Sequence, residues 1–344
     1  MSVPAHPAPY LSAATVSTVA GAAGSKGRTD GAGVVARFTY PMGIAAAPNG
    51  AFYLADEENM TVRRLLPTGE VGTVAGAATT KGSADGVGAT ARFYHPVGLA
   101  VAADGTLYVT DADNHTIRKI SPDGTVSTLA GTVGRKGAAD GPGSAAQFNL
   151  PHGVALDARG NVYVADTFNH TIRKIAPDGT VTTLAGAPGR KGSVDGPGPL
   201  ARFFHPSALA IDAQGGLYVA DNGNETIRKI SPAGEVTTLA GTARHGGYTD
   251  GIAATARFRA PTGVAVDARG NVFVVDHLNA LIRRITPTGD VTTLAGTVLH
   301  VGAEDGAGGS ARFNGPSGIA IDARGTTLYV TDSANHTVRK IALE

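Results

Sequence analysis

The chain has 344 residues, of which 42% are hydrophobic, and a formal net charge of +1 at pH 7. This hydrophobic content supports a packed core, and the near-zero charge gives no bulk attraction to nucleic acid or anionic membranes. The absence of cysteine excludes disulfides, a thiolate nucleophile and a cysteine-based zinc site, but leaves the cellular compartment open.

Residues 1 to 15 precede the regular part of the chain and are predicted to be an N-terminal tail. Met1 to Ala14 has neither the basic start nor the apolar centre of a signal peptide, and no apolar run in the chain is long enough to span a membrane. We therefore expect a soluble protein, either cytoplasmic or exported with its signal already removed. We also expect a monomer.

From residue 16 onward, one sequence pattern occurs six times at a spacing of 55 residues. The pattern V-x-T-[LV]-A-G begins at Val16, Val71, Val126, Val181, Val236 and Val291. A fixed period of this size indicates a closed or stacked repeat architecture. The repeats continue to Ile341 without a linker, so residues 16 to 344 are predicted to form one domain.

Each repeat predicts four short antiparallel strands in meander order. After Pro151 the chain reads P-H-G-V-A-L, N-V-Y-V-A-D, T-I-R-K-I and V-T-T-L-A-G, with turn-forming residues between these runs. A loop of about twenty residues then leads to the next repeat, which is long enough to expect order of its own. We expect the repeated Asp and Arg of this loop, such as Asp195 and Arg202, to pair with each other or to cap turns.

Six four-stranded sheets repeated radially predict an all-β, six-bladed β-propeller. The chain starts with a lone fourth strand at Val16 to Gly21 and stops after a third strand at Thr337 to Ile341. We therefore predict that the N-terminal strand completes the last blade and closes the ring, which removes exposed strand edges.

The repeat P-x-G-[IV]-A-x-D-x-x-G-N-V-Y-V-A-D-x-x-N-H-x-I-R-K-I resembles the NHL repeat over essentially the whole region from Val16 to Ile341. The resemblance implies a propeller. Its relatives include bacterial sensor domains, RNA- or protein-binding ends of animal regulators and a zinc-dependent amidating lyase. A propeller fold by itself does not define function, because such folds serve both enzymes and binding platforms.

Sequence differences between the copies concentrate on one predicted face, where the first strand of each blade begins and the second ends. Histidines occupy the positions before the proline in two blades and after it in a third, at His95, His205 and His152. Histidine is a common metal ligand and a general base near neutral pH. One hypothesis is therefore a metal or proton-transfer site built from these three residues, and the alternative is three separate polar rim residues.

A zinc site of the family type is not indicated. The amidating lyase that shares this repeat places its zinc histidines directly after the proline, and only Pro151-His152-Gly153 matches that pattern here. A divalent metal such as zinc would have to be bound by a different geometry that also uses His95 and His205.

The turns from Asp to Asn, such as Asp166 to Asn169, recur in all six repeats, so their ends are predicted to be structural. His115, His170 and His336, which follow three of these turns, receive the same interpretation. The middle pairs vary and include apolar Phe168 and Leu278 at expected exposed positions. Lysines recur in four of the long loops, including Lys191, and form either an arc for an anionic ligand or a solvated rim.

The favoured function is a binding module for a small molecule, protein or peptide on this face, over the channel mouth. The candidate ligand-binding residues are Tyr40, His95, His152, Phe168, His205, Arg259 and His277. The alternatives are a hydrolase or lyase that uses the channel-mouth histidines, with or without a metal, and a near-symmetric scaffold without a ligand. Low aromatic content and the lack of a combined aromatic and basic stripe argue against nucleic acid.

Overall fold

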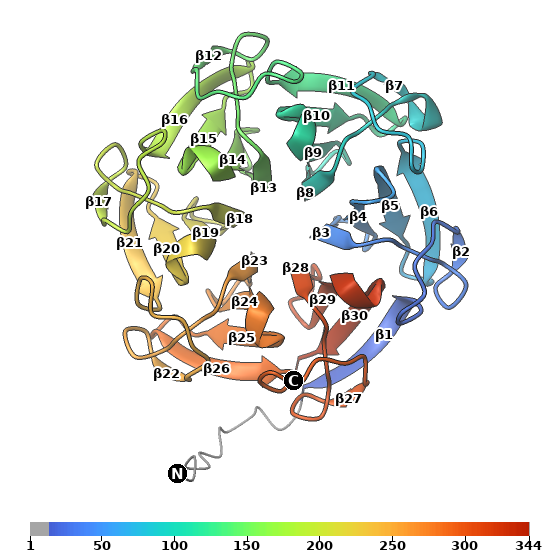
Figure 1. Ribbon diagram of the computed structural model, residues 1–344, viewed down its shortest axis with the longest axis vertical. Coiled ribbons are helices and arrows are strands. Elements are labelled where there is room, and N and C mark those ends of the chain that lie inside the picture. The colour runs from blue at the N-terminus through green and yellow to red at the C-terminus, as the bar shows by residue number, and fades with distance from the viewer. Residues whose placement is uncertain (1–13, 344) are drawn as a thin grey trace.

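The computed structural model describes residues 14 to 343 and contains six antiparallel sheets arranged around a central axis (Figure 1). Each sheet has five strands and forms one blade. From the axis outward, the strands of blade 1 are β3, β4, β5, β6 and β2, and the other blades repeat this order. The predicted six-bladed, all-β propeller is confirmed. The predicted tail lies outside the described residues, except for residues 14 and 15.

The strands closest to the axis all begin at a proline. They are β3 (Pro41–Ala46), β8 (Pro96–Val101), β13 (Pro151–Leu156), β18 (Pro206–Ile211), β23 (Pro261–Val266) and β28 (Pro316–Ile321). The second strands are β4 (Phe52–Asp56), β9 (Leu107–Asp111), β14 (Val162–Asp166), β19 (Leu217–Asp221), β24 (Val272–Asp276) and β29 (Thr327–Asp332). The third strands are β5 (Thr61–Leu65), β10 (Thr116–Ile120), β15 (Thr171–Ile175), β20 (Thr226–Ile230), β25 (Leu281–Ile285) and β30 (Thr337–Ala342).

The fourth strands are β6 (Glu70–Ala75), β11 (Thr125–Ala130), β16 (Thr180–Gly186), β21 (Glu235–Ala240), β26 (Asp290–Ala295) and, for blade 6, β1 (Thr15–Gly21). The outermost strands are β2 (Gly31–Ala32), β7 (Gly86–Val87), β12 (Gly141–Pro142), β17 (Gly196–Pro197), β22 (Gly251–Ile252) and β27 (Gly306–Ala307). Single 3-10 turns are η1 (Gly88–Thr90), η2 (Ala112–Asn114), η3 (Thr167–Asn169), η4 (Asn222–Asn224), η5 (His277–Asn279) and η6 (Ser333–Asn335). The described residues contain no helix with the length and apolar character needed to cross a membrane.

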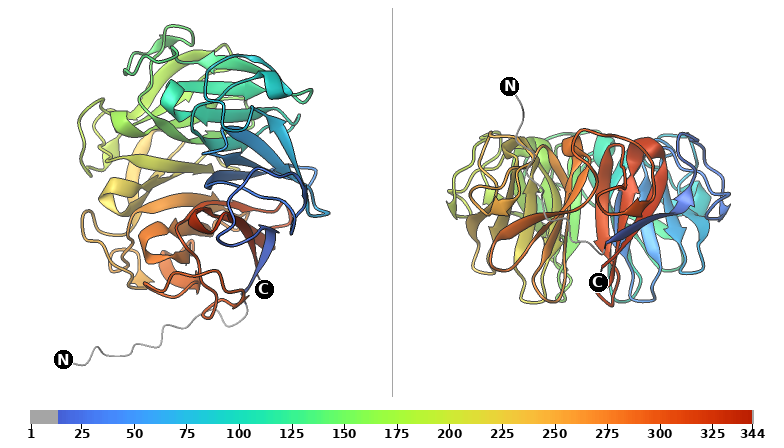
Figure 2. Two further views of the ribbon diagram at one scale, coloured as in Figure 1. Left: turned by 45° about the vertical axis from the view of Figure 1, so that its right-hand side comes forward. Right: turned by 90° about the horizontal axis from the view of Figure 1, so that it is seen from below.

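The N-terminal strand closes the ring, as predicted. β1 lies antiparallel to β30, with Thr15 opposite Ala342 and Gly21 opposite Thr337. The two strands, from opposite ends of the chain, lie side by side in blade 6 (Figures 1 and 2). The closure leaves the outer edge of β30 covered, as in the other five blades.

The blades have five strands and not the predicted four, because the long loop contributes a two-residue strand. This short strand pairs with the outer strand of the blade that follows, as Gly86 and Val87 do opposite Val126 and Thr125. Two residues carry too little periodic pattern to be recognised in the sequence as a strand. The loop thus connects neighbouring blades along their outer edges before the chain returns to the axis.

The apolar core lies between blades. A phenylalanine that precedes each innermost strand is fully buried, as Phe93 is, and it packs in one cluster with Val62 of blade 1 and Val109 of blade 2. Six such clusters, each drawn from two adjacent blades, surround the axis. Because each cluster needs both neighbours, the core is complete only when the ring is closed.

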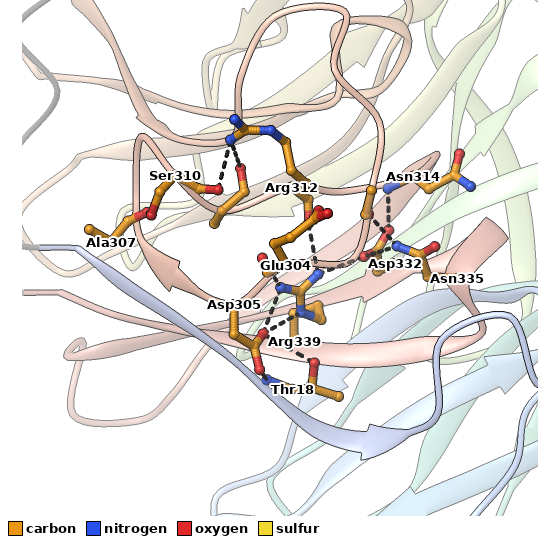
Figure 3. Close-up of polar contacts among 12 residues, drawn as sticks. Thr18, Glu304, Asp305, Ala307, Ser310, Arg312, Asn314, Asp332, Asn335 and Arg339 are labelled. Carbon is orange, nitrogen blue, oxygen red and sulfur yellow. Dashed lines mark hydrogen bonds and ion pairs between the residues drawn. The ribbon is translucent and has the colours of Figure 1, made fainter.

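A buried arginine organises the polar interior of every blade. In blade 6, Arg339 of β30 pairs with Asp332 (2.9 Å) and with Asp305 of the long loop (2.7 Å), as Figure 3 shows. The guanidinium also lies over the ring of Phe313, 5.1 Å from its centroid. A buried charge of this kind is tolerated only when it is fully paired. The equivalent arginines are Arg63, Arg118, Arg173, Arg228 and Arg283.

The loop aspartate therefore has a different partner from the one expected. Asp195 pairs with Arg228 of the third strand and not with Arg202 of its own loop. The loop arginine caps a turn, which was the other prediction: the Arg202 guanidinium donates to the carbonyl groups of Pro199 and Ala201. The sequence pattern did not reveal the third-strand arginine, because its charged side chain lies inside a strand that otherwise reads as half-exposed.

Candidate functional site

The candidate site is the face of the ring that carries the six strand-opening prolines and the six Asp-to-Asn turns, here called the upper face. The turn ends are structural, as predicted. In blade 1 the Oδ1 atom of Asp56 accepts the backbone N–H of Thr39 (2.7 Å), and Oδ2 accepts the amide of Asn59 (2.8 Å). These contacts recur in every blade.

The histidines after three turns connect neighbouring blades. Nδ1 of His336 accepts the backbone N–H of Tyr40 (3.2 Å), and Nδ1 of His170 accepts that of His205 (3.3 Å). His115 makes the same contact with Leu150 (3.3 Å). The predicted structural role of these histidines is confirmed.

The residue before each proline has a left-handed backbone in all six blades. The φ angles are 54° at Tyr40, 53° at His95, 48° at Leu150, 50° at His205, 50° at Ala260 and 57° at Gly315. This conformation is unfavourable for residues other than glycine, and a residue before proline is normally extended. The preceding residue is fixed in every blade, because its backbone N–H is bound by the turn aspartate, as that of Thr39 is by Asp56. In three blades a histidine also binds the backbone N–H of the left-handed residue itself, as His336 does at Tyr40.

The central channel is narrow and has no room for a large ligand. Its cavity of about 100 Å³ is lined by the residues after each proline and by an aliphatic ring below them. The upper lining residues are Met42, Val97, His152, Ser207, Thr262 and Ser317. The Gly of P-x-G brings the innermost strands together, because a Cβ at Gly98 would meet the carbonyl of His152. Pockets for drug-sized ligands are typically about 300–1,000 Å³, so a large partner has to bind outside the channel.

An acidic patch, formed by Glu57, Glu58 and Asp113, lies over blades 1 and 2. The His95 ring contacts it, with Nδ1 2.8 Å from Oδ2 of Asp113. Burial raises the pKa of Glu57 to about 7, although the nearby His95 acts in the opposite direction. A carboxyl group with this pKa exchanges its proton near neutral pH, which is the property of a general acid or base.

His152 occupies the channel mouth. Burial lowers the pKa of His152 to about 4; the charge of His205 lowers it further, and that of Asp113 raises it. The imidazole is therefore neutral at pH 7. Within residues 14 to 343 its ring has no hydrogen-bond partner, so both ring nitrogens are available to a ligand.

An aromatic patch, formed by Phe168, His170, Phe204, His205 and Lys191, lies over blades 3 and 4. Ring centroids are 4.7 Å apart for Phe168 and His205, 4.5 Å for Phe204 and His205, and 4.8 Å for His170 and His205. Nζ of Lys191 lies 4.8 Å from the centroid of Phe204. Phe168 remains 44% exposed, so the patch presents an apolar ring to solvent.

The other three predicted residues lie apart from these patches. Tyr40 is exposed and packs edge-on to His336 at the junction of blades 6 and 1. Nδ1 of His277 donates to the carbonyl oxygen of Pro316 (2.8 Å), a bond between blades that Thr167 and Ser333 also make at their positions. The exposed Arg259 uses its backbone N–H to bind Asp276.

The hypothesis of a metal site at His95, His152 and His205 is not supported. Among residues 14 to 343, no three His, Cys, Asp or Glu side chains come together in a way that could hold a metal ion. The physical reason is the left-handed backbone before the proline. It directs His95 to Asp113 and His205 to Phe168, whereas His152 lines the channel.

Sequence reasoning did not select the carboxylates of the acidic patch or the residues that complete the aromatic patch. One signal was available for the carboxylates: the middle pairs of the turns contain Glu57, Glu58 and Asp113 in blades 1 and 2 and no acid elsewhere. Phe204 and Lys191 belong to other columns of the repeat, and only the folded chain places them beside Phe168 and His205.

Comparison with known families places the chain among NHL-repeat proteins. The NHL repeat model matches residues 93–120, 148–175 and 313–341. NHL repeat-containing protein 2 of Bos taurus is 31% identical over 299 residues, and that of Homo sapiens is 30% identical over 298. Each match covers 76% of this chain and 41% of the relative, so the chain spans about two-fifths of the length of these relatives. The protein is an NHL-repeat β-propeller.

Solved structures share the fold. A protein of unknown function from Bacteroides thetaiotaomicron superposes with a TM-score of 0.74 at 24% identity, covering 96% of this chain and 76% of that one. A gluconolactonase from Xanthomonas campestris gives 0.62 at 15% identity, with 96% and 90% covered. Virginiamycin B lyase from Staphylococcus aureus gives 0.57 at 16% identity, with 89% and 96% covered. At these identities only the fold is shared.

Proposed function

We propose that this propeller is a binding module for a protein or peptide, which docks on the upper face over blades 1 to 4. The observation that carries the proposal is the aromatic patch. Phe168 is half-exposed and packs on His205, which also packs on Phe204, the ring that lies under Lys191. Aromatic groups held in this way are common energetic centres of protein interfaces.

The narrow channel supports a surface partner over a buried small molecule. Its cavity of about 100 Å³ holds a few water molecules, and its middle is aliphatic, with Ile44, Leu99 and Val154 among the lining residues. Specific side chains are found instead on the turns around the mouth. A partner that covers these turns can contact several blades at once.

The chain contains a matched control for a test of this proposal. Phe168 and Leu278 occupy the same position of the turn in blades 3 and 5 and are both exposed, at 44% and 52%. Peptides selected from a random dodecapeptide display library on the full-length protein should bind Phe168→Asp at least about tenfold more weakly than wild type. Binding to Leu278→Asp should be unchanged. A library that yields no binder, or binders indifferent to both changes, would instead indicate a scaffold without a ligand.

A second candidate function is acid–base catalysis, and the contact between His95 and Asp113 favours it. A histidine held by a carboxylate is a common general base, and Glu57 supplies a second group that titrates near pH 7. Turnover of a panel of lactones and activated esters, lost in His95→Gln, would support a hydrolase or lyase. Equal turnover by the variant, or none by wild type, would remove this candidate.

A further inference from the structure

The upper face is divided by charge. In the middle pairs of the turns, carboxylates occur only in blades 1 and 2, where they form the acidic patch. The pairs in the other blades are Thr167-Phe168, Asn222-Gly223, His277-Leu278 and Ser333-Ala334, without an acid. The aromatic patch, which includes the cation of Lys191, lies on this second side.

The pKa values of neighbouring histidines reflect the same difference in charge. Burial lowers the pKa of both His115 and His336, and the nearby carboxylates of Asp113 and Glu58 oppose that effect more strongly than Lys136 and Lys26 add to it. Burial also lowers the pKa of His205, but there the other charged neighbours, His170 and Lys191, lower it further. Carboxylates therefore outweigh the lysines near His115 and His336, whereas His205 of the aromatic patch has no acidic group among its charged neighbours.

The two patches border the same part of the channel mouth. The carbonyl oxygen of His152 accepts the hydroxyl of Thr110 in blade 2 (2.6 Å), and a Cβ at Gly153 would meet Ala208 of blade 4, so the strand of His152 lies between the blades of the two patches. Charges of both patches, on Asp113 and His205, act on the pKa of its ring. Since electrostatic effects weaken over a distance of about 10 Å, the patches are close enough for one short segment of a partner to contact both.

Other charged groups near these turns include Glu225 and Lys81. The carboxylate of Glu225 lies against Gly246 of a long loop, where a Cβ on that glycine would collide with it. Lys81, on the long loop before blade 2, lies over the ring of Tyr94 (5.0 Å) as Lys191 lies over that of Phe204 (4.8 Å), so the two sides differ in their carboxylates and not in their lysines.

Resting on the proposed function, we propose that the partner is a peptide segment with a basic side chain and, a few residues away, an aromatic side chain next to a carboxylate. The basic group binds the acidic patch, the aromatic ring packs on Phe168 and His205, and the carboxylate pairs with Lys191. Charge complementarity selects this occupant. A single-stranded nucleic acid could stack on the aromatic patch, but its phosphates would be repelled by Glu57, Glu58 and Asp113.

The experiment selects dodecapeptides on the full-length protein with counter-selection on Phe168→Asp, and then tests charge reversals. Enriched peptides should share the aromatic–acidic pair and a separate Lys or Arg. Glu58→Lys, at an exposed position, should weaken their binding about tenfold. Replacing the peptide's basic residue with Glu should restore binding to that variant. Glu70→Lys, an exposed change in the same blade on β6, serves as the control and should have no effect.

The outcomes separate this inference from the proposed function. Phe168-dependent peptides that lack a basic residue, or that bind Glu58→Lys as well as wild type, would overturn the inference and leave the binding module in place. A selection without any Phe168-dependent peptide would overturn both. If a single-stranded oligoribonucleotide binds wild type and not Phe168→Asp, the partner of this face is nucleic acid and not a peptide.

Discussion

Each Asp-to-Asn turn has two ends that belong to the blade interior and a middle pair that lies over the channel mouth. The ends are the same in all six blades, where Asp166 and its equivalents bind a buried arginine, an asparagine and a backbone amide. The middle pairs differ in every blade. Because the ends close a polar network without access to water, any change there leaves a buried group unpaired. The second residue of each pair escapes this constraint and is free to carry specificity, whereas the first residue bonds to the next blade at Thr167, His277 and Ser333.

The largest expected effect comes from breaking the ring itself. Deletion of residues 1 to 21 removes β1, which exposes the edge of β30 and uncovers the cluster that Val16 shares with Ile341. We expect a loss of several kcal/mol in stability and a tendency to aggregate, because both the core and the strand edge are opened. Thermal unfolding followed by circular dichroism measures the effect. A truncated protein that melts like the full chain would contradict the closure of the ring.

Removal of one buried arginine should be nearly as severe. Arg173→Leu leaves Asp166 buried without its ionic partner, and breaking such a pair costs about 3–5 kcal/mol. Arg283→Leu in blade 5 should cost a similar amount, because the network repeats there. Urea denaturation of both variants tests this equivalence. A large loss of stability in one variant and a small loss in the other would show that equivalent networks with the same geometry contribute unequally to stability.

Asp140→Ala should be milder, because this aspartate is partly exposed. Its carboxylate contacts Arg173 and the backbone N–H and hydroxyl of Thr183, and its side chain is 47% exposed. We expect a loss of about 1–3 kcal/mol from unpaired hydrogen-bonding groups. The same substitution at Asp250 provides the comparison between blades. A loss of peptide binding in Asp140→Ala with unchanged stability would instead place this residue in the functional part of the molecule.

The stability of the protein should depend on pH through His152 at the channel mouth. His152 has a pKa of about 4 in the folded chain and about 6.5 when unfolded, so protonation favours the unfolded state. The stability contribution is complete above pH 6.5 and is lost as the pH falls toward 4. Because the channel mouth is open to water, we expect this contribution to the free energy of unfolding to be only ~1–2 kcal/mol. His152→Ser, which copies blades 4 and 6, should flatten the difference in melting temperature between pH 7 and pH 4. An unchanged pH profile would show that His152 is solvated.

The smallest effect on stability is expected where the effect on binding is largest. Phe168→Asp places at this position the residue type that blade 2 already has at Asp113, and exposed substitutions of this kind change stability by about 0.5 kcal/mol or less. Unfolding curves that match wild type, together with lost peptide binding, would show that Phe168 contributes to binding and not to stability. A strongly destabilised variant would show that the aromatic patch is part of the packing.

Much of the fold could be predicted because the repeat is explicit in the residues. The period of 55, the Pro-x-Gly strand starts and the phase of the chain ends determined the number of blades and the closure by β1. The fifth strand escaped prediction because Gly86 and Val87 gain their strand character only from pairing with the next blade. The partner of Asp140 escaped for a similar reason, since Arg173 lies 33 residues further along the chain.

The site was predicted only in outline. The sequence by itself placed Tyr40, His95, His152, Phe168 and His205 on one face, because turn positions follow from the repeat. Only the tertiary structure decided which of these side chains meet. Residues before proline are normally extended, but all six are left-handed here, next to a backbone N–H that the turn aspartate binds, and this directs His95 and His205 to different neighbours from those of His152. Local sequence determines where a turn lies, whereas side-chain direction depends on tertiary contacts such as that of His205 with Phe168 of the neighbouring blade.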